Sequence, residues 1–271
     1  MKAVSTVSRR VSLISAACPV VALLLRGVPI RAEEVPLVAA AADLRFALAE
    51  IAERFTRETG ERVGLVFGSS GNIARQIRQG APFALFLSAD EAYVLDLARD
   101  GFTRDEGTLY AIGRLVLLVP NGSPLALDGT LEDLARAIRD GRLRRFAIAD
   151  PAHAPYGKRA DEVLRYKGIR EAIRPFLVYG ENVAQAAQFA TSGNAEGGIV
   201  AYSLALSPQL QALGGHAPIP AEWHAPLRQR MVRLRGAGPV ADRFYGYLQA
   251  EPARAIFRRY GFVLPGEPVT E

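Results

Sequence analysis

Short apolar runs alternate with stretches of helical periodicity along most of this chain. From residue 33 onward, each apolar run is followed by apolar residues three or four positions apart, the spacing of one face of a helix. The first such face is formed by Leu44, Leu48, Ile51, Ala52 and Phe55. Gly60 follows it, and a glycine in this place is typical of a helix end. The pattern predicts an α/β fold, in which helices flank a sheet.

The same pattern predicts the positions of the remaining elements. Strands are expected at residues 38–42, 62–67, 83–87, 114–120, 146–149, 176–178, 198–201 and 230–234. Helices are expected at residues 72–79, from residues 88–91 onward, at 131–138, after the loop at 150–157, at 183–190 and in two final segments. Residues 208–227 contain several glycines and prolines, so this segment is expected to be mostly loop.

Two of the strand-to-helix junctions share one design. Residues 38–44 and 66–75 each begin as an apolar strand, break at small or polar residues and continue as an amphipathic helix. The first turn of a helix has unpaired backbone N–H groups and a partial positive charge, so two helix starts facing one crevice can hold an anion. Residues 150–157 and 180–183 form two further junctions in the second half of the chain. The junctions together predict an oxyanion receptor.

The second junction carries the clearest candidate side chains. Its sequence Gly68-Ser69-Ser70-Gly71-Asn72 has two hydroxyl donors where the helix begins, and its glycines allow the backbone to approach a ligand. Ordinary helix capping by serine and asparagine explains the same residues. Asp43 has the matching place at the first junction, where a carboxylate stabilises a helix start but repels an anion. Either Asp43 points away from the ligand or the site is not simply anionic.

The motifs of common enzymes are missing from these segments. Residues 68–71 lack the lysine of a phosphate-binding loop, the glycine spacing of a dinucleotide site and the Gly-x-Ser-x-Gly pattern of a hydrolase. The three histidines, His153, His216 and His224, lack metal-ligand spacing, so structural roles are expected for them. We therefore expect a binding protein without a cofactor. A serine hydrolase that uses Ser70 as its nucleophile remains the enzyme alternative.

Residues 1–32 have the pattern of a secretory signal peptide. They contain five basic residues and no acidic one, an apolar stretch at residues 11–25, and the small residue Ala32 where cleavage is expected. The apolar stretch is shorter than the roughly 20 residues that a membrane-spanning helix needs. Ser8-Arg9-Arg10-Val11-Ser12-Leu13 also resembles a twin-arginine export signal, so both export routes stay open.

The leader also accounts for the net charge of +5. The residues after it carry 28 basic and 28 acidic side chains, so charge does not favour nucleic acid or an anionic membrane surface as a partner. The one cysteine, Cys18, lies in the leader, and lipidation there is an alternative to simple cleavage. The rest of the chain has no cysteine, which excludes a disulfide, a thiol nucleophile and a zinc-thiolate site.

In their order along the chain, these segments resemble the periplasmic molybdate-binding proteins of ABC transporters. The segments concerned are residues 38–44, 67–77, 80–91, 150–157 and 257–262. The most specific are 80–91, Gly-Ala-Pro-Phe-Ala-Leu-Phe-Leu-Ser-Ala-Asp-Glu, and 150–157, Asp-Pro-Ala-His-Ala-Pro-Tyr-Gly. The resemblance extends over essentially the whole chain after the leader.

The resemblance implies a two-lobed type II periplasmic binding protein fold. Each lobe is then a mixed sheet flanked by helices, and the ligand lies in the cleft between lobes that close by a hinge motion. We expect lobe 1 to comprise residues 33–112 and 229–271, and lobe 2 residues 113–228. The implied function is that of a periplasmic monomer that captures molybdate or tungstate and delivers it to the membrane permease of an ABC transporter.

The resemblance also implies which residues contact the oxyanion. By position, Ser70 supplies a hydroxyl, and Ser69 lies beside it. Tyr156 and Val183 supply backbone N–H groups, so their side chains are expected to matter little for affinity. The contacts to molybdate itself are therefore expected from Ser70, Tyr156 and Val183, and Tyr202 is the nearest match to a tyrosine that closes the site.

The first junction departs from the family pattern. Where the family has Ser, Thr or Asn, this chain has Ala42 and Asp43, so one hydroxyl donor is missing. We expect Asp43 to cap its helix while the N–H groups of Ala42 and Asp43 face the anion. Sulfate, phosphate or a small organic acid stay open as ligands, because phosphate can carry a proton and favours a site with an acceptor.

Overall fold

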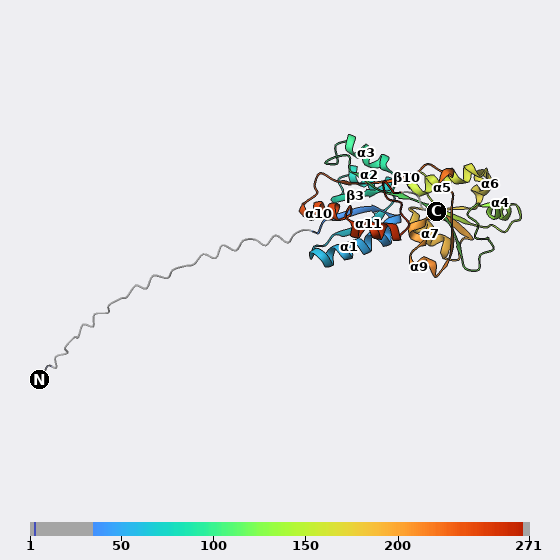
Figure 1. Cartoon of the computed structure of the whole chain (residues 1–271), viewed down its shortest axis with the longest axis horizontal. Coiled ribbons are helices and arrows are strands. Elements are labelled where there is room, and N and C mark those ends of the chain that lie inside the picture. The colour runs from blue at the N-terminus through green and yellow to red at the C-terminus, as the bar shows by residue number, and fades with distance from the viewer. Residues whose placement is uncertain (1–2, 4–34, 268–271) are drawn as a thin grey trace. The chain divides into compact units, whose positions relative to one another are not determined.

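The computed structural model describes residue 3 and residues 35–267, which fold around two five-stranded sheets (Figure 1). The predicted signal peptide, its cleavage after Ala32 and the alternative of lipidation at Cys18 lie outside the described residues. Within the described part, no helix is both long and apolar enough to cross a membrane.

The first sheet has the strand order β2-β1-β3-β10-β4. Its strands are β1 (Leu37–Ala41), β2 (Gly64–Gly68), β3 (Phe83–Ser88), β4 (Thr108–Gly113) and β10 (Leu227–Arg233). Strand β1 pairs in parallel with both β2 and β3, and Ala39 lies opposite Val66 on one side and Phe86 on the other. Strand β10 is antiparallel to β3 and β4. The sheet is therefore mixed, with its parallel strands on one side.

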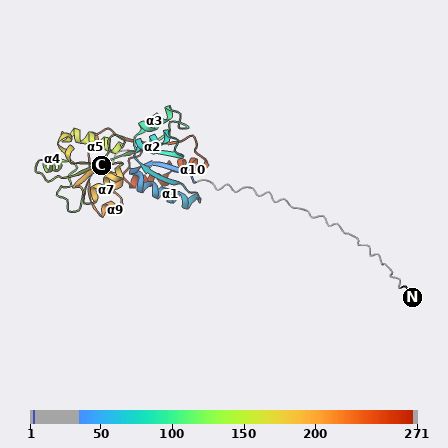
Figure 2. The same cartoon turned by 180° about the vertical axis from the view of Figure 1, so that it is seen from behind.

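Helices cover both faces of this sheet, as helical patterns that alternate with buried strands predict. Its helices are η1 (Ala42–Leu44), α1 (Arg45–Thr59), α2 (Ser70–Arg78), α3 (Glu91–Arg99), α10 (Pro239–Tyr247) and α11 (Glu251–Arg259). On one face, Leu48 and Phe55 of α1 pack with Phe244 and Phe257 from the last two helices. On the opposite face, α2 and α3 cover Phe86 (Figures 1 and 2).

The second sheet has the strand order β7-β6-β8-β5-β9. Its strands are β5 (Leu115–Pro120), β6 (Phe146–Ala149), β7 (Leu177–Gly180), β8 (Gly197–Ala201) and β9 (Gly214–Pro218). The helical segments of this half are α4 (Glu132–Arg139), α5 (Pro155–Tyr166), α6 (Arg170–Ile173), η2 (Arg174–Phe176), α7 (Val183–Thr191), α8 (Tyr202–Ala205), α9 (Pro208–Gln211) and η3 (Ala221–Trp223). Strand β6 is parallel to β7 and β8, whereas β5 is antiparallel to β8 and β9. Two mixed sheets flanked by helices confirm the predicted fold class.

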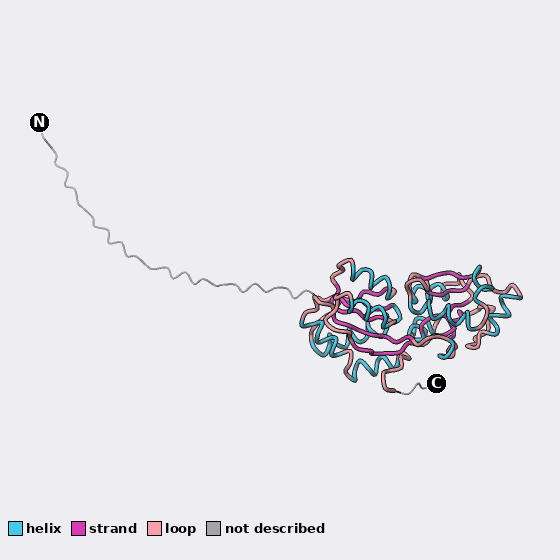
Figure 3. Tube along the Cα trace, turned by 90° about the horizontal axis from the view of Figure 1, so that it is seen from above, coloured by secondary structure: helices cyan, strands magenta, loops and turns pink. Residues whose placement is uncertain are grey.

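Strands also connect the two sheets. Only Arg114 separates β4 of the first sheet from β5 of the second, and in Figure 3 strand segments continue from one group of elements into the other. The chain returns to the first sheet at Leu227, three residues before the predicted strand. Strands β4 and β9 were not predicted. Strand β9 consists of Gly-Gly-His-Ala-Pro, a composition that does not favour a strand, and its pairing with β5 overrides that composition.

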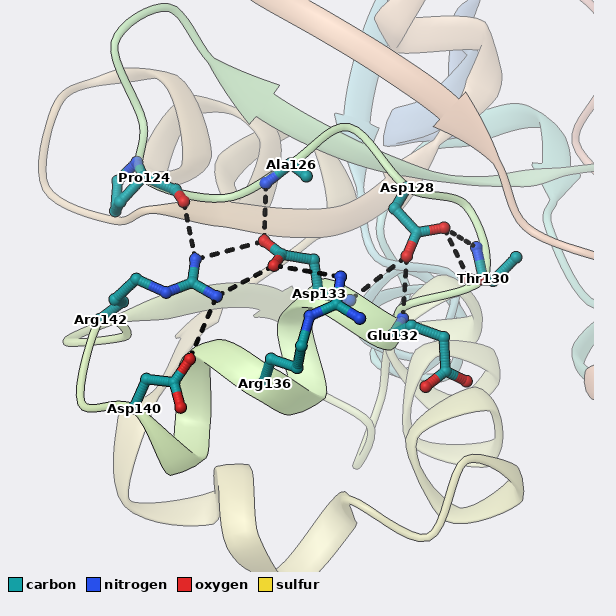
Figure 4. A network of polar contacts seen from close by, with 9 residues as sticks. All are labelled: Pro124, Ala126, Asp128, Thr130, Glu132, Asp133, Arg136, Asp140 and Arg142. Atoms are coloured by element: carbon teal, nitrogen blue, oxygen red, sulfur yellow. Dashed lines mark hydrogen bonds and ion pairs between the residues drawn. The ribbon is translucent and has the colours of Figure 1, made fainter.

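A polar network stabilises the loop before α4 and the start of that helix (Figure 4). The carboxylate of Asp128 accepts backbone N–H groups of Glu132 and Asp133 at 3.0 and 3.2 Å, which satisfies donors of the first turn. The Asp133 carboxylate accepts the Ala126 N–H at 2.8 Å and pairs with Arg142 at 2.9 Å. The Arg142 guanidinium and the Ala126 N–H hold the pKa of Asp133 at about 2. The network therefore needs Asp133 in its ionised form.

Candidate anion-binding site

A small pocket lies where four strand-to-helix junctions meet. The space between its lining residues, including the part that is open to solvent, is about 190 Å³. The described residues that line it are Ala41, Ala42, Asp43, Gly68, Ser69, Ser70, Ala89, Ala154, Pro155, Tyr156, Asn182 and Val183. None of these residues is a lysine, an arginine or a histidine. A small anion in this pocket would therefore be held by N–H groups and hydroxyls.

The topology of the two sheets brings these junctions together. Strands β1 and β2 are parallel, so their carboxyl ends lie at one edge of the first sheet, where η1 and α2 begin. Strands β6 and β7 are parallel in the second sheet, and α5 and α7 follow them. Ligands of such α/β sheets bind at the carboxyl ends of the strands, next to the starts of helices. The pocket thus has helix starts from both sheets in its wall.

Ser70 is held in an orientation that leaves its hydroxyl proton available. The side chain is fully buried at the first position of α2. Its Oγ accepts the backbone N–H of Ala89 at 3.0 Å. Since that bond uses a lone pair of the oxygen, the hydroxyl can still donate to another group. Ser70 can therefore donate to an oxyanion without giving up its bond to Ala89.

Ser69 is bound by a side chain from the second half of the chain. Its Oγ lies 2.9 Å from Nδ1 of His153, and Nε2 of the same ring lies 3.5 Å from the Asp150 carboxylate. The N–H of Gly71 donates to the carbonyl of His153 at 3.0 Å, and a Cβ on residue 71 would come within 2.7 Å of that oxygen. The expected structural role of His153 agrees with this geometry, because the histidine orients Ser69.

Two helices of the second half begin at the pocket wall, where their first-turn N–H groups have no partner within the helix itself. Helix α5 starts at Pro155, which has no N–H, so Tyr156 provides the first donor of that helix. At α7, the Asn182 side chain accepts the N–H groups of Ala184 and Gln185 at 3.0 and 3.1 Å. Val183 begins this helix, and its N–H lies outside that cap. Tyr156 and Val183 therefore lie in the pocket wall at the starts of their helices, and the contact of their N–H groups with an anion stays a prediction.

Asp43 does not cap its helix, contrary to the prediction. Neither η1 nor α1 has a side-chain cap. Instead, Oδ2 of Asp43 accepts Nε2–H of Gln229 at 2.6 Å and the hydroxyl of Tyr156 at 3.0 Å, while Oδ1 is buried and has no partner within the described residues. The side chain is 1% exposed. Burial raises the pKa of Asp43 to about 6, against the opposing hydrogen bonds from Gln229 and Tyr156.

Two residues of this network, Tyr110 and Gln229, were not predicted from the sequence. The Tyr110 hydroxyl donates to Oε1 of Gln229 at 2.7 Å, which turns the Gln229 amide N–H toward Asp43. Gln229 is fully buried between the equally buried Leu227 and Met231, so a polar residue in an inward position of β10 was the available signal. The Tyr156 side chain belongs to the same network. The Tyr156 side chain thus has a structural contact in the free protein, and the prediction that it matters little for affinity stays a prediction.

Tyr202 does not line the pocket, although it was expected to close the site. Its ring lies 5.4 Å from the His216 ring, and a Cβ on Gly261 would come within 2.5 Å of it. Its backbone N–H donates to the carbonyl of Arg114 at 2.9 Å. Tyr202 begins α8, and that helix start directs the ring toward β9 and the end of α11. The neighbouring Ser203 instead donates its hydroxyl to the Asp43 carbonyl at 2.8 Å.

Several hydrogen bonds join the two halves around the pocket. They include the bonds of Asp43 with Tyr156 and Ser203, and those of Ser69 and Gly71 with His153. The Asn72 side chain also donates to Glu181 at 3.2 Å. All of these bonds connect residues of the protein alone. The arrangement around the pocket is therefore supported by protein groups from both sheets.

The chemistry of the pocket is that of a binding site. Within residues 35–267 and residue 3, no group of three or more His, Cys, Asp or Glu side chains is placed to hold a metal ion. The hydrogen bond of the nearby His153 goes to Ser69, whereas Ser70 accepts from a backbone amide. A serine hydrolase needs a base on its nucleophile, so the geometry gives no support to Ser70 as a nucleophile.

Comparisons with known proteins point in the same direction. The sequence profile described as "Bacterial extracellular solute-binding protein" matches residues 36–263. The molybdate-binding protein ModA of Rhodobacter capsulatus is 37% identical over 239 residues, covering 87% of this chain and 90% of the relative. ModA of Azotobacter vinelandii is 34% identical over 230 residues, covering 84% and 89%.

A solved structure has the same fold. The periplasmic molybdate-binding protein of Azotobacter vinelandii superposes with a TM-score of 0.76 at 30% sequence identity. The superposition covers 85% of this chain and 99% of that protein. The similarity in sequence and in structure thus extends over both sheets and over all four junctions of the pocket.

Proposed function

Because this chain belongs to the family of bacterial extracellular solute-binding proteins, we propose that it captures molybdate or tungstate and delivers it to the membrane permease of an ABC transporter. One observation carries the proposal: the starts of η1, α2, α5 and α7 line a single small pocket without a cationic side chain. Helix starts bind anions through N–H groups and a partial positive charge. The protein is accordingly a binding protein and not an enzyme.

The proposed contacts come from both sheets. Ser70 donates its hydroxyl, and Tyr156 and Val183 donate backbone N–H groups, in agreement with their places in the pocket wall. Ala42 contributes backbone N–H, and Ser69 contributes through the position that His153 fixes. A four-oxygen anion has enough acceptors for all of these donors.

The proposed lobes follow the two sheets. Residues 33–112 and 229–271 form lobe 1, and residues 113–228 form lobe 2. Since Leu227 and Arg228 pair with β4, the sheets favour a boundary two residues earlier. The connections through Arg114 and before Leu227 are then the hinge, and closure of the lobes buries the ligand between them.

We also propose that the protein works in the periplasm as a monomer. The leader of residues 1–32 supports export, and the names of similar proteins include a periplasmic one. Cleavage after Ala32 would release the binding protein from its leader. Export of the protein in its folded state would favour the twin-arginine route over the general secretory route.

Phosphate is a second candidate, favoured by one specific observation. Asp43 lines the pocket with a carboxyl group, and an ionised carboxylate can accept the proton of hydrogen phosphate. Molybdate and sulfate carry no such proton near neutral pH. The charge state of Asp43 therefore bears on which anion is bound.

A thermal-shift panel tests the proposal. The exported form of the protein, freed of ligand, is heated with molybdate, tungstate, sulfate, phosphate or small carboxylates. A ligand at a hundred times its dissociation constant stabilises the folded state by about 2.7 kcal/mol, which corresponds to a rise in melting temperature of roughly 5 to 10 °C for a protein of this size. A rise with molybdate and tungstate supports the proposal. A rise with carboxylates alone would contradict it.

A further inference from the structure

Asp43 presents a conflict of charge in a pocket built for an anion. Its side chain is 1% exposed and belongs to the pocket wall, so an ionised carboxylate there would repel a bound oxyanion. No lysine, arginine or histidine is among the described residues of that wall. A neighbouring cation therefore does not neutralise the carboxylate, and a proton is the simplest way to remove its charge.

The hydrogen bonds of the carboxyl group determine where such a proton would lie. Oδ2 already accepts two donors, Nε2–H of Gln229 at 2.6 Å and the Tyr156 hydroxyl at 3.0 Å. Gln229 is fixed in this orientation because its Oε1 accepts the Tyr110 hydroxyl at 2.7 Å. Oδ1 is buried without a partner within the described residues. A protonated carboxyl has one O–H donor, and Oδ1 is the oxygen left to carry it.

The titratable groups around Asp43 do not supply a positive charge that would neutralise its carboxylate. Tyr110 and Tyr156 face the carboxyl group, and burial next to Asp43 raises the pKa of both phenols well above 10, so both stay neutral. Of the helices packed against η1, α1 carries the exposed Arg45 in its first turn and its other charged residues from Glu50 onward, and α8 carries Tyr202. On β10, Arg228 and Arg230 flank Gln229 and pair with Glu91. On α5, Lys158 is exposed and Arg159 pairs with Asp90 and Glu162. Helix α7 and strand β2, which also contact η1, contain no titratable residue.

We propose that Asp43, as a neutral acid, donates a hydrogen bond from Oδ1 to the bound oxyanion. This inference rests on the proposed function. In the reaction, the Asp43 carboxylate, one proton from solvent and a fully deprotonated dianion combine, and no other bond forms or breaks. The protonated aspartate thereby replaces the hydroxyl donor that Ser, Thr or Asn would supply. The raised pKa of the free carboxyl, about 6, agrees with a group that takes up a proton easily.

Affinity for such a dianion then depends on pH. Below the pKa of Asp43 the site already holds the proton, and the dissociation constant is constant. Above it, each pH unit weakens binding tenfold, because the proton must be taken from a more dilute solution. Between pH 6 and 8 the loss is roughly fiftyfold, because half of the sites already lack the proton at pH 6. Hydrogen phosphate brings its own proton to an ionised Asp43, so its binding needs no uptake from solvent.

Titration calorimetry of the exported form with molybdate tests the proposal directly. At pH 8, repeated titrations in buffers of different ionisation enthalpy should show uptake of close to one proton per molybdate. The dissociation constant should rise roughly fiftyfold from pH 6 to pH 8. Asp43→Asn keeps the shape of the side chain and provides a permanent N–H donor. Its dissociation constant should therefore be independent of pH and should be lower than that of the parent at pH 8.

Asp96→Asn is the matched control, because it removes an exposed carboxylate of α3 outside the pocket and should keep the slope of the parent. Molybdate binding by the parent without proton uptake would overturn the proposal, and so would an unchanged slope in Asp43→Asn. The measurement on the parent needs no variant, so misfolding of Asp43→Asn would not remove the test. If the parent binds none of molybdate, tungstate, sulfate and phosphate at any pH while both proteins are folded, the proposed function itself fails.

Discussion

Replacing Ser70 by alanine removes one atom that has two tasks. Oγ of Ser70 accepts the Ala89 N–H at 3.0 Å, and its proton is available for the oxyanion. A hydrogen bond to a charged partner contributes about 1.5 to 3 kcal/mol. The dissociation constant for molybdate should therefore rise roughly ten- to hundredfold in Ser70→Ala. Because the Ala89 N–H is left unpaired in a fully buried place, the free energy of unfolding should also fall by about 1 to 3 kcal/mol.

Two measurements separate these effects. Titration calorimetry with molybdate gives the change in affinity, and urea unfolding of the ligand-free protein gives the change in stability. Ser69→Ala is the matched control, since its hydroxyl already contacts Nδ1 of His153 at 2.9 Å. Its affinity should change less than that of Ser70→Ala. A folded Ser70→Ala protein whose dissociation constant stays within twofold of the parent would refute the role of Ser70.

Three further changes test other parts of the structure. The pKa of Asp43 rises from 3.8 to about 6 on folding, so the folded state is destabilised as the pH rises from 3.8 to about 6. Urea unfolding should show that the free energy of unfolding falls by about 3 kcal/mol over this range, and Asp43→Asn should abolish the fall. The pKa of Asp133 falls from 3.8 to about 2 on folding, so its contribution to stability should persist at neutral pH and disappear only as the pH falls from 3.8 toward 2. Asp133→Ala should lower the free energy of unfolding at pH 7 by about 2 kcal/mol. An unchanged free energy of unfolding would contradict the network with Arg142. In Gly113→Ala the new Cβ would come within 2.2 Å of the Tyr156 hydroxyl; this overpacking should cost about 1 to 3 kcal/mol in thermal or urea unfolding, and an unchanged stability would contradict the close packing.

The sequence predicted the fold and the four junctions because both depend on local signals. Alternation of apolar residues shows which segments are strands and which are helices. Small, capping and proline residues mark the helix starts, as at Ser70, Pro155 and Asn182. Parallel strands then bring those starts to one edge of each sheet. The resemblance to a family added the order of the segments along the whole chain.

The orientation of Asp43 could not be predicted in this way. Its partners Tyr156 and Gln229 lie 113 and 186 residues away in the chain, and no local pattern links them to Asp43. Helix capping was the local preference, and tertiary hydrogen bonds replaced it. Tyr202 was misplaced for a related reason, because the start of α8 and contacts with β9 decide where its ring points. Strand β9 depends on pairing with β5 rather than on its own residues.

Two of the hydrogen bonds that join the two halves involve no residue of the pocket wall, so they can affect affinity without affecting selectivity. Contacts such as Asn72 with Glu181 and Gly71 with His153 involve no ligand atom. Under the proposed hinge closure, such contacts change the fraction of molecules that are closed, and that fraction scales the apparent dissociation constant of every anion by the same factor. Discrimination between two anions depends only on the pocket wall. Substitutions at the outer contacts can therefore tune the protein to the abundance of its ligand without altering which ligand it prefers.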